Sequence, residues 1–184
     1  MNPPMANGGG GGTLVGMEPQ DIHPAVRVGH VHLRVADLDR ALNFYRYALG
    51  FGVVADGREV GLDAAFLAAG DYHHRVGLNT WESAGGVPPP AGHTGLYHVA
   101  FLYPDRRELG RAVQRLLDHD HPIDHASDHG GSVSVYLSDP DGNGVELYYD
   151  RPRADWVDAE GRMILKAERF DYRELLPESA TAGR

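Results

Sequence analysis

The sequence predicts an α+β protein built from two paired βαβββ units, and three observations lead to this fold class. Two stretches alternate polar and apolar residues as half-buried strands do, and each is followed by an aspartate that can cap a helix. Asp37 comes seven residues after His30, and Asp105 comes seven residues after His98, so the pattern repeats at an interval of 68 residues. Because one unit has too few strands to bury its own faces, the two units must pair.

The first unit covers about residues 26–81. Alternation over residues 28–35 predicts a strand that carries His30 and His32 on its polar side. A helix is expected to begin after Asp37 and to end at Gly50. Short strands are expected at 51–56, 63–69 and 74–80, and the glycines and prolines of residues 82–95 predict a long loop.

The second unit covers about residues 95–150 and follows the same order. A strand is expected at 97–101, then a helix that begins after Asp105 and stops before Pro122, then strands around 136–137 and 145–147. The two units form one domain over residues 25–156. The Gly/Pro-rich residues 1–24 are expected to be a flexible leader, and residues 157–184 a C-terminal extension.

Composition excludes several classes of protein. The chain has 184 residues and a net charge of −9, which disfavours a nucleic-acid-binding module because phosphate binding needs a basic face. With no cysteine, the chain cannot form disulfides, thiolate zinc sites or a cysteine nucleophile. No apolar run is long enough to span a membrane, and the N-terminus lacks the features of a signal peptide. We therefore expect a cytoplasmic protein without membrane contacts.

The repeat places a possible metal site. Four equivalent strand positions should converge where the units meet, namely His30 and Gly77 in the first unit and His98 and Glu146 in the second. Three of them are metal ligands, and two imidazoles with one carboxylate are the donor set of a facial triad that holds Fe(II) and leaves positions open. Mn(II) or another divalent metal would also suit this set. His32 shares a strand face with His30 and is the alternative ligand.

Five segments then resemble one known family, the vicinal oxygen chelate superfamily, which includes glyoxalase I, bleomycin- and fosfomycin-resistance proteins and the type I extradiol (catechol 2,3-) dioxygenases. The resemblance covers about residues 26–156 and implies paired βαβββ modules that form one curled mixed β-sheet around a metal site. The segments are GHVHLRVAD at 29–37, NFY at 43–45, LGF at 49–51, LYHVA at 96–100 and DPDGNGVEL at 139–147.

Within that family, the candidate site is closest to the extradiol branch. The resemblance implies three ligands there, at His30, His98 and Glu146, whereas glyoxalase I has a fourth ligand at the position of Gly77. It also implies that His74 is an acid–base catalyst and that Tyr136 binds the substrate hydroxyl. His129 resembles a further histidine of the substrate pocket.

The resemblance implies an Fe(II)-dependent extradiol ring-cleaving dioxygenase that acts on a catechol-type aromatic diol with O2, and a homodimer. Two alternatives from other classes stay open. One is a single-domain protein that binds and sequesters a small ligand, and the other is a glyoxalase-like metal-dependent lyase or isomerase. The familiar extradiol enzymes often carry two such domains, whereas this chain has one.

Overall fold

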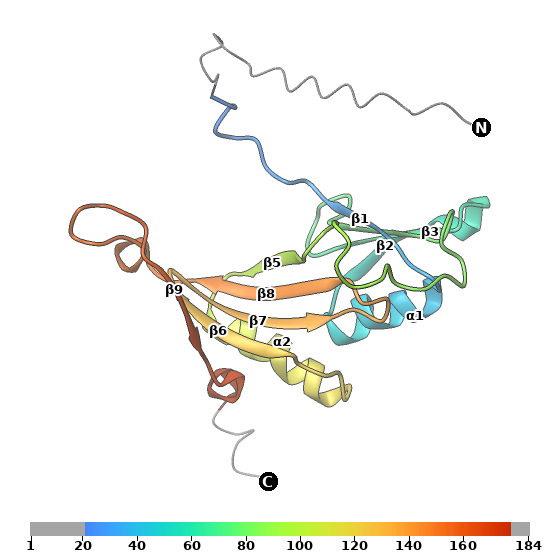
Figure 1. Ribbon diagram of the computed structural model, residues 1–184. Helices are drawn as coiled ribbons and strands as arrows, with labels where there is room; N and C mark the ends of the chain where they lie inside the picture. Colours follow the sequence, from blue (N-terminus) through green and yellow to red (C-terminus); the bar gives the residue numbers. More distant parts are fainter. Residues whose placement is uncertain (1–20, 178–184) are drawn as a thin grey trace, which may run out of the picture.

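The computed structural model describes residues 21–177, so most of the expected leader and the last seven residues of the C-terminal extension lie outside the described residues. Two mixed β-sheets, of four and five strands, lie one beside the other (Figure 1). Each sheet packs one helix against one of its faces. Within the described residues, no helix is long and apolar enough to cross a membrane.

The first sheet has the strand order β1-β4-β3-β2, with β1 parallel to β4 and the other pairs antiparallel. Asp37 caps α1 by accepting a hydrogen bond from the backbone N–H of Arg40, as the sequence predicts. The helix then continues as a π-helical turn that ends before Gly50, whose φ is +88°. The elements are β1 (Val31–Arg34), α1 (Leu38–Asn43), the π-turn (Phe44–Ala48), β2 (Gly52–Asp56), β3 (Ala64–Ala68) and β4 (Val76–Asn79).

The second sheet has the order β5-β8-β7-β6-β9, again with one parallel pair, β5 and β8. Asp105 caps α2 by accepting from the backbone N–H of Glu108. The elements are β5 (Val99–Tyr103), α2 (Arg106–Asp118), β6 (His125–Gly130), β7 (Ser132–Ser138), β8 (Gly144–Asp150) and β9 (Leu165–Arg169).

Strand register confirms the internal repeat. Val31 pairs with Val76 in the first module, and Val99 pairs with Val145 in the second. His30 and His98 therefore occupy equivalent positions, one residue before these pairs, and Gly77 and Glu146 are equivalent one residue after them. The α+β class with two paired βαβββ modules is confirmed, although the described strands form two mixed sheets rather than one continuous sheet.

One hydrophobic core joins the helices to one face of each sheet. Alternate residues of the strands point to this core, and residues of α1 and α2 pack with them. Among residues 21–177, neither of these α-helices covers the opposite face of a sheet. We call these opposite faces of the two sheets the open faces. Strand residues of the core include Leu33, Leu67, Val76, Leu78, Val135, Leu137, Val145 and Leu147.

The C-terminal extension is part of the second sheet. Its strand β9 pairs antiparallel with β6, and the turn that follows buries Leu175 against α2. A Cβ atom at Gly110 of α2 would collide with the Leu175 carbonyl, so the close approach of this turn requires glycine.

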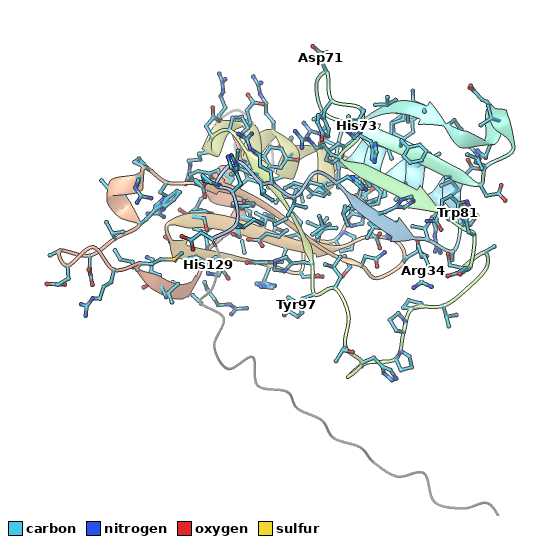
Figure 2. All side chains as sticks on the ribbon, turned by 90° about the horizontal axis from the view of Figure 1, so that it is seen from above. Arg34, Asp71, His73, Trp81, Tyr97 and His129 are labelled. Carbon is cyan, nitrogen blue, oxygen red and sulfur yellow. The ribbon has the colours of Figure 1, made fainter. Side chains whose placement is uncertain are left out.

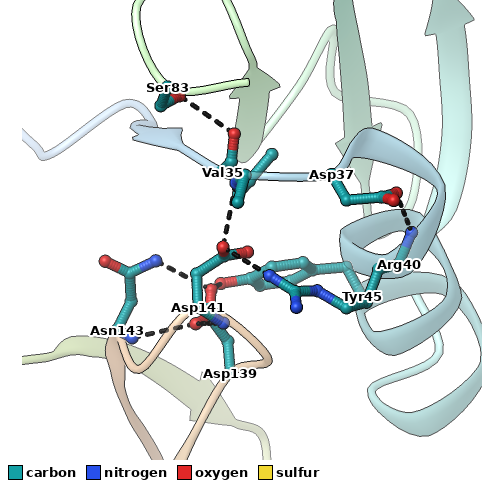
Figure 3. Close-up of polar contacts among 9 residues, drawn as sticks. Val35, Asp37, Arg40, Tyr45, Ser83, Asp139, Asp141 and Asn143 are labelled. Carbon is teal, nitrogen blue, oxygen red and sulfur yellow. Dashed lines mark hydrogen bonds and ion pairs between the residues drawn. The ribbon is translucent and has the colours of Figure 1, made fainter. Parts of the chain in front are cut away.

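The β7–β8 turn fastens the second module to the first (Figure 3). Asp141 accepts hydrogen bonds from the backbone N–H of Ala36 at 2.9 Å and from the Arg40 guanidinium at 2.7 Å. Asp139 accepts from the hydroxyl of Tyr45 at 3.0 Å. Both carboxylates follow β7 and precede the Glu146 strand, so these contacts help to set where Glu146 lies relative to β1.

Candidate functional site

Paired residues form a row across the open face of the second sheet, and two of them, Tyr136 and Glu146, are predicted site residues. Tyr136 of β7 pairs with His125 of β6 on one side and with Glu146 of β8 on the other. Glu146 in turn pairs with Ala100 of β5. Side chains of paired residues share a face, so these strands direct Tyr136, Glu146 and the nearby His98 to the same side of the sheet.

His98 and Glu146 form the centre of this face. The Nε2 atom of His98 lies 2.9 Å from Oε2 of Glu146, and Glu146 is only 9% exposed, between the core residues Val145 and Leu147. The other ring nitrogen of His98, Nδ1, is buried and has no hydrogen-bond partner within residues 21–177. A buried carboxylate is costly unless a cation or hydrogen bonds compensate it, and imidazole with carboxylate is a donor set that divalent metals accept. The pair fits part of a metal site.

Tyr136 and His129 extend this pair into a hydrogen-bonded chain. The Tyr136 hydroxyl donates to Oε1 of Glu146 at 3.1 Å and lies 2.9 Å from Nε2 of His129. On the other side of its ring, Nδ1 of His129 lies 3.0 Å from the Lys166 carbonyl, which can only accept. The proton of a neutral His129 is therefore on Nδ1, and its Nε2 is an acceptor. The Tyr136 hydroxyl has a single proton, so at any one time it can donate a hydrogen bond either to Glu146 or to His129.

The surroundings of Tyr136 keep its hydroxyl protonated. Burial, and then the negative charge of Glu146, raise the pKa of Tyr136 above its usual value. The ring of His125 stacks on the Tyr136 ring, with centroids 4.5 Å apart and an angle of 14° between the planes. His125 was not among the site residues predicted from the sequence. Its spacing from His129, four residues along one strand, was the signal that could have placed both on one face.

His30 and His74 lie together on the first module. Their ring centroids are 4.4 Å apart, and the His74 ring also contacts Phe66 at 5.1 Å. Nδ1 of His74 lies 2.7 Å from Nδ1 of His73. Desolvation, and then the charges of His30, His73 and His32, lower the pKa of His74 and favour its neutral form.

The structure does not bring His30 to the His98–Glu146 pair. In residues 21–177, no group of three His, Asp or Glu side chains is close enough to hold a metal ion. Figure 2 shows His129 on the second module and His73 in the β3–β4 connection of the first module. Between the modules runs a groove of about 1000 Å³, whose walls include His30 from one module and Ala100 and Tyr148 from the other. His30 and the second sheet thus face a common space.

His32, the alternative ligand, has a packing role in this structure. Its ring contacts Phe66 and Trp81, at centroid distances of 6.0 and 5.6 Å, and covers Gly77. A Cβ atom at Gly77 would lie 3.0 Å from the His32 ring, so a side chain there would force His32 to move. The space that a fourth ligand would need at position 77 is therefore filled by His32.

Comparison with known proteins agrees with this fold. The family described as the glyoxalase/bleomycin resistance protein/dioxygenase superfamily matches residues 27–147. Among curated proteins, the chain is 41% identical over 160 residues to a catechol-2,3-dioxygenase of Bacillus subtilis, covering 86% of this chain and 54% of that one. It is 34% identical over 125 residues to biphenyl-2,3-diol 1,2-dioxygenase 3 of Rhodococcus globerulus, covering 67% and 63%. The chain thus spans about half to two thirds of the length of these relatives.

Solved structures show the same architecture. A glyoxalase/dioxygenase from Nostoc punctiforme superimposes with a TM-score of 0.58 at 23% identity, over 74% of this chain and 100% of the other. A lactoylglutathione lyase from Agrobacterium tumefaciens superimposes with a TM-score of 0.52 at 27% identity, over 69% and 96%. On the family match, the paired modules and these relatives, the chain belongs to the glyoxalase/bleomycin resistance protein/dioxygenase superfamily.

Proposed function

We propose that the protein is an Fe(II)-dependent extradiol ring-cleaving dioxygenase that acts on catechol-type aromatic diols with O2. The observation that carries the proposal is the chain of contacts from His98 through Glu146 and Tyr136 to His129 on one open face. The likeness to catechol-2,3-dioxygenase and biphenyl-2,3-diol dioxygenase supports the same reaction class.

His98 and Glu146 are proposed as two ligands of the metal, with His30 as the third. The 2.9 Å contact between His98 and Glu146 supports the first two, and the equivalence of His30 with His98 in the repeat supports the third. A bound Fe(II) would supply chelation of the two adjacent diol oxygens and redox chemistry with O2. His30 lines the groove between the modules together with Ala100, the strand partner of Glu146, and in this proposal it approaches the pair from that groove.

The other predicted residues are proposed to handle protons and to orient the ring. Tyr136, protonated and within reach of both Glu146 and His129, can donate its hydrogen bond to a substrate hydroxyl. His129 is held in one tautomer by the Lys166 carbonyl, and its Nε2 can accept from the Tyr136 hydroxyl when that proton is not donated to Glu146 or to substrate. His74, beside His30, is proposed as the group that accepts and returns a proton at the reacting oxygen.

Anaerobic loading with Fe(II), followed by catechol and air, tests the proposal. The expected results are O2 uptake in proportion to bound iron and a yellow product that absorbs in the visible range, as a ring-opened semialdehyde does. Metal-free protein and Zn(II)-loaded protein are the controls, since neither should consume O2 with catechol. Absence of uptake with every diol tried, in protein that holds iron, would contradict the proposal.

One observation favours a second candidate, the binding of a small ligand without turnover. Within the described residues His30 contacts His74 and does not form a metal-binding group with the His98–Glu146 pair. A protein that only binds a small molecule needs a groove and polar contacts, but it does not need a complete set of metal-coordinating residues. It would bind a catechol with measurable affinity and show no O2 uptake. The expected homodimer and cytoplasmic location stay predictions.

A further inference from the structure

The β3–β4 connection, residues 69–75, holds the chain on both sides of His30. The backbone carbonyl of Arg75 accepts a hydrogen bond from the N–H of Val31 at 3.0 Å. The guanidinium of the same residue donates to the Gly29 carbonyl at 3.3 Å. Arg75 thus brackets His30, which lies one residue before β1 begins.

The position of His30 explains why such an anchor matters. The parallel pairing of β1 with β4 begins at Val31, so His30 lies just outside the last pair. Residues 21–29 belong to no helix or strand of the described structure. Because a chain frays where its pairing ends, the contact from Arg75 to Gly29 extends the ordered backbone past His30.

Tyr72 keeps the Arg75 guanidinium in place. The guanidinium carbon lies 3.8 Å from the centre of the Tyr72 ring, a distance at which the electron-rich face of the ring attracts a cation. The Tyr72 hydroxyl also approaches Gly29, where an added Cβ atom would be 3.6 Å away from it. Both side chains of the connection therefore close on the backbone of Gly29.

The same connection carries His74, which contacts the side chain of His30. Ring contacts run along the connection from Tyr72 to His73, with centroids 4.2 Å apart, and from His73 to His74, with centroids 4.6 Å apart. The His74 ring then meets the His30 ring at a centroid distance of 4.4 Å. Figure 2 shows the connection as a loop that projects from the first module, with Asp71 at its tip. The connection therefore contacts the start of β1 twice, once at the backbone before His30 and once at the His30 ring.

We propose that Arg75, placed by Tyr72, is a positioning residue for His30. It would fix the His30 imidazole beside the His74 imidazole by holding the backbone of Gly29. The metal-ligand role of His30 and the proton-transfer role of His74 are those of the proposed function, on which this inference rests. The placement of the two rings does not depend on those roles, so it can be measured in metal-free protein.

Nuclear magnetic resonance of the metal-free, full-length protein with labelled histidine rings measures this placement. A nuclear Overhauser effect between the ring protons of His30 and His74 reports that the rings are adjacent, and His30→Gln and His74→Gln assign the two signals. We expect the effect in the wild type and its loss in Arg75→Met, which keeps the apolar part of the side chain and removes the guanidinium. The backbone contacts between β1 and β4 should remain, because the carbonyl that accepts from Val31 is not changed.

Arg46→Met is the matched control. The Arg46 guanidinium lies 5.0 Å from the ring of Tyr47 in the π-turn of the same module, so this variant also removes a contact between an arginine and a tyrosine. Tyr72→Phe keeps the ring that faces the Arg75 guanidinium and should retain the Overhauser effect, whereas Tyr72→Leu should lose it. Both Tyr72 and Arg75 are exposed, so these changes should not unfold the chain, and thermal melts check this.

Titration with Co(II), followed by its visible absorption, measures the consequence for metal binding. Arg75→Met should weaken Co(II) binding about tenfold, a usual effect for a residue that orients a metal ligand. Arg46→Met and Tyr72→Phe should bind Co(II) as the wild type does. His30→Ala is the reference, since it removes the proposed ligand itself.

The outcomes separate this inference from the proposed function. An Overhauser effect that is absent from the wild type, that persists in Arg75→Met, or that is lost equally in Arg46→Met would overturn the positioning role. Unchanged Co(II) affinity in Arg75→Met would also overturn it, provided that His30→Ala binds Co(II) more weakly. If His30→Ala binds Co(II) as the wild type does, the ligand role of His30 fails, while the Overhauser effect still decides the positioning by Arg75.

Discussion

Tyr45 of the first module donates a hydrogen bond of 3.0 Å to the Asp139 carboxylate of the second module, and both side chains are buried. Tyr45 belongs to the π-turn that follows α1, and Asp139 begins the turn that leads into the Glu146 strand. Together with the hydrogen bonds from Ala36 and Arg40 to Asp141, this contact helps to fix the position of the second module relative to the first (Figure 3).

Tyr45→Phe should lower the free energy of unfolding by about 1 kcal/mol, because it removes one buried hydrogen bond and no packing. The loss is not larger because Asp139 keeps three other donors, the backbone N–H groups of Asp141 and Asn143 and the side-chain amide of Asn143. Urea unfolding at neutral pH measures it. Tyr47→Phe, at a half-exposed tyrosine two residues away, is the control and should not change the midpoint.

The same hydrogen bond predicts a dependence of stability on alkaline pH. Burial, and then the charge of Asp139, raise the pKa of Tyr45 well above its usual value of about 10. Above pH 10 the unfolded chain releases this proton while the folded chain keeps it, so the contribution is complete below about pH 10 and is lost as the pH rises further. The stability advantage of the wild type over Tyr45→Phe should therefore be smaller at about pH 11 than at about pH 9, with the loss falling above about pH 10. A constant difference across that range would contradict the assignment.

Local sequence rules predicted both helices and most of the strands, whereas Tyr136 was predicted from the family resemblance and His125 was not predicted. The caps at Asp37 and Asp105 begin both helices, and period-two alternation places Tyr136 and Glu146 on the open face. These features depend on neighbours in sequence or on register within one module. The repeat adds the equivalence of His30 with His98, because both modules use the same parallel pairing.

Features that depend on contacts between distant segments were not predictable in this way. The separation of His30 from the His98–Glu146 pair depends on how the modules dock, which the hydrogen bonds of Asp139 and Asp141 help to set. Strand β9 pairs through its backbone with the edge of β6, and its residues show no clear alternation. The pairing of β9 with β6 therefore had no signal in the sequence.

Replacement of the proposed ligands should separate a three-ligand site from a two-ligand site. Glu146→Ala and His98→Ala should each abolish stoichiometric iron binding and leave the fold intact, because neither side chain belongs to the hydrophobic core and Tyr136 still donates to Glu146 when His98 is replaced. His30→Ala should also lose the metal if His30 is the third ligand. His93→Ala, at an exposed loop histidine, is the control.

Metal analysis after anaerobic loading and gel filtration provides the measurement, with thermal melts of the same samples. Full retention of iron in His30→Ala, beside its loss in His98→Ala, would restrict the site to the second module and end the role proposed for His30. Retention in both Glu146→Ala and His98→Ala would contradict the metal site as a whole.

The final prediction concerns proton transfer. His74→Phe should keep the metal and bind catechol but lose about 10²–10⁴ in turnover, the usual contribution of a well-placed acid–base group. Tyr136→Phe should lose less, about tenfold or below, because it removes one hydrogen bond of about 1 kcal/mol. Steady-state O2 uptake is measured, with iron content determined on the same samples.

His73→Phe is the matched control for His74→Phe, since the two histidines are adjacent and their Nδ1 atoms are 2.7 Å apart. Of these two histidines, His74 is the one whose ring packs against the His30 ring in the described residues. If His74 has a specific role in proton transfer, His74→Phe should therefore lower turnover far more than His73→Phe does. Equal losses would mean that the histidine pair acts through the packing of the β3–β4 connection. Normal turnover in His74→Phe would leave the proposed ligands in place and remove His74 as the acid–base catalyst.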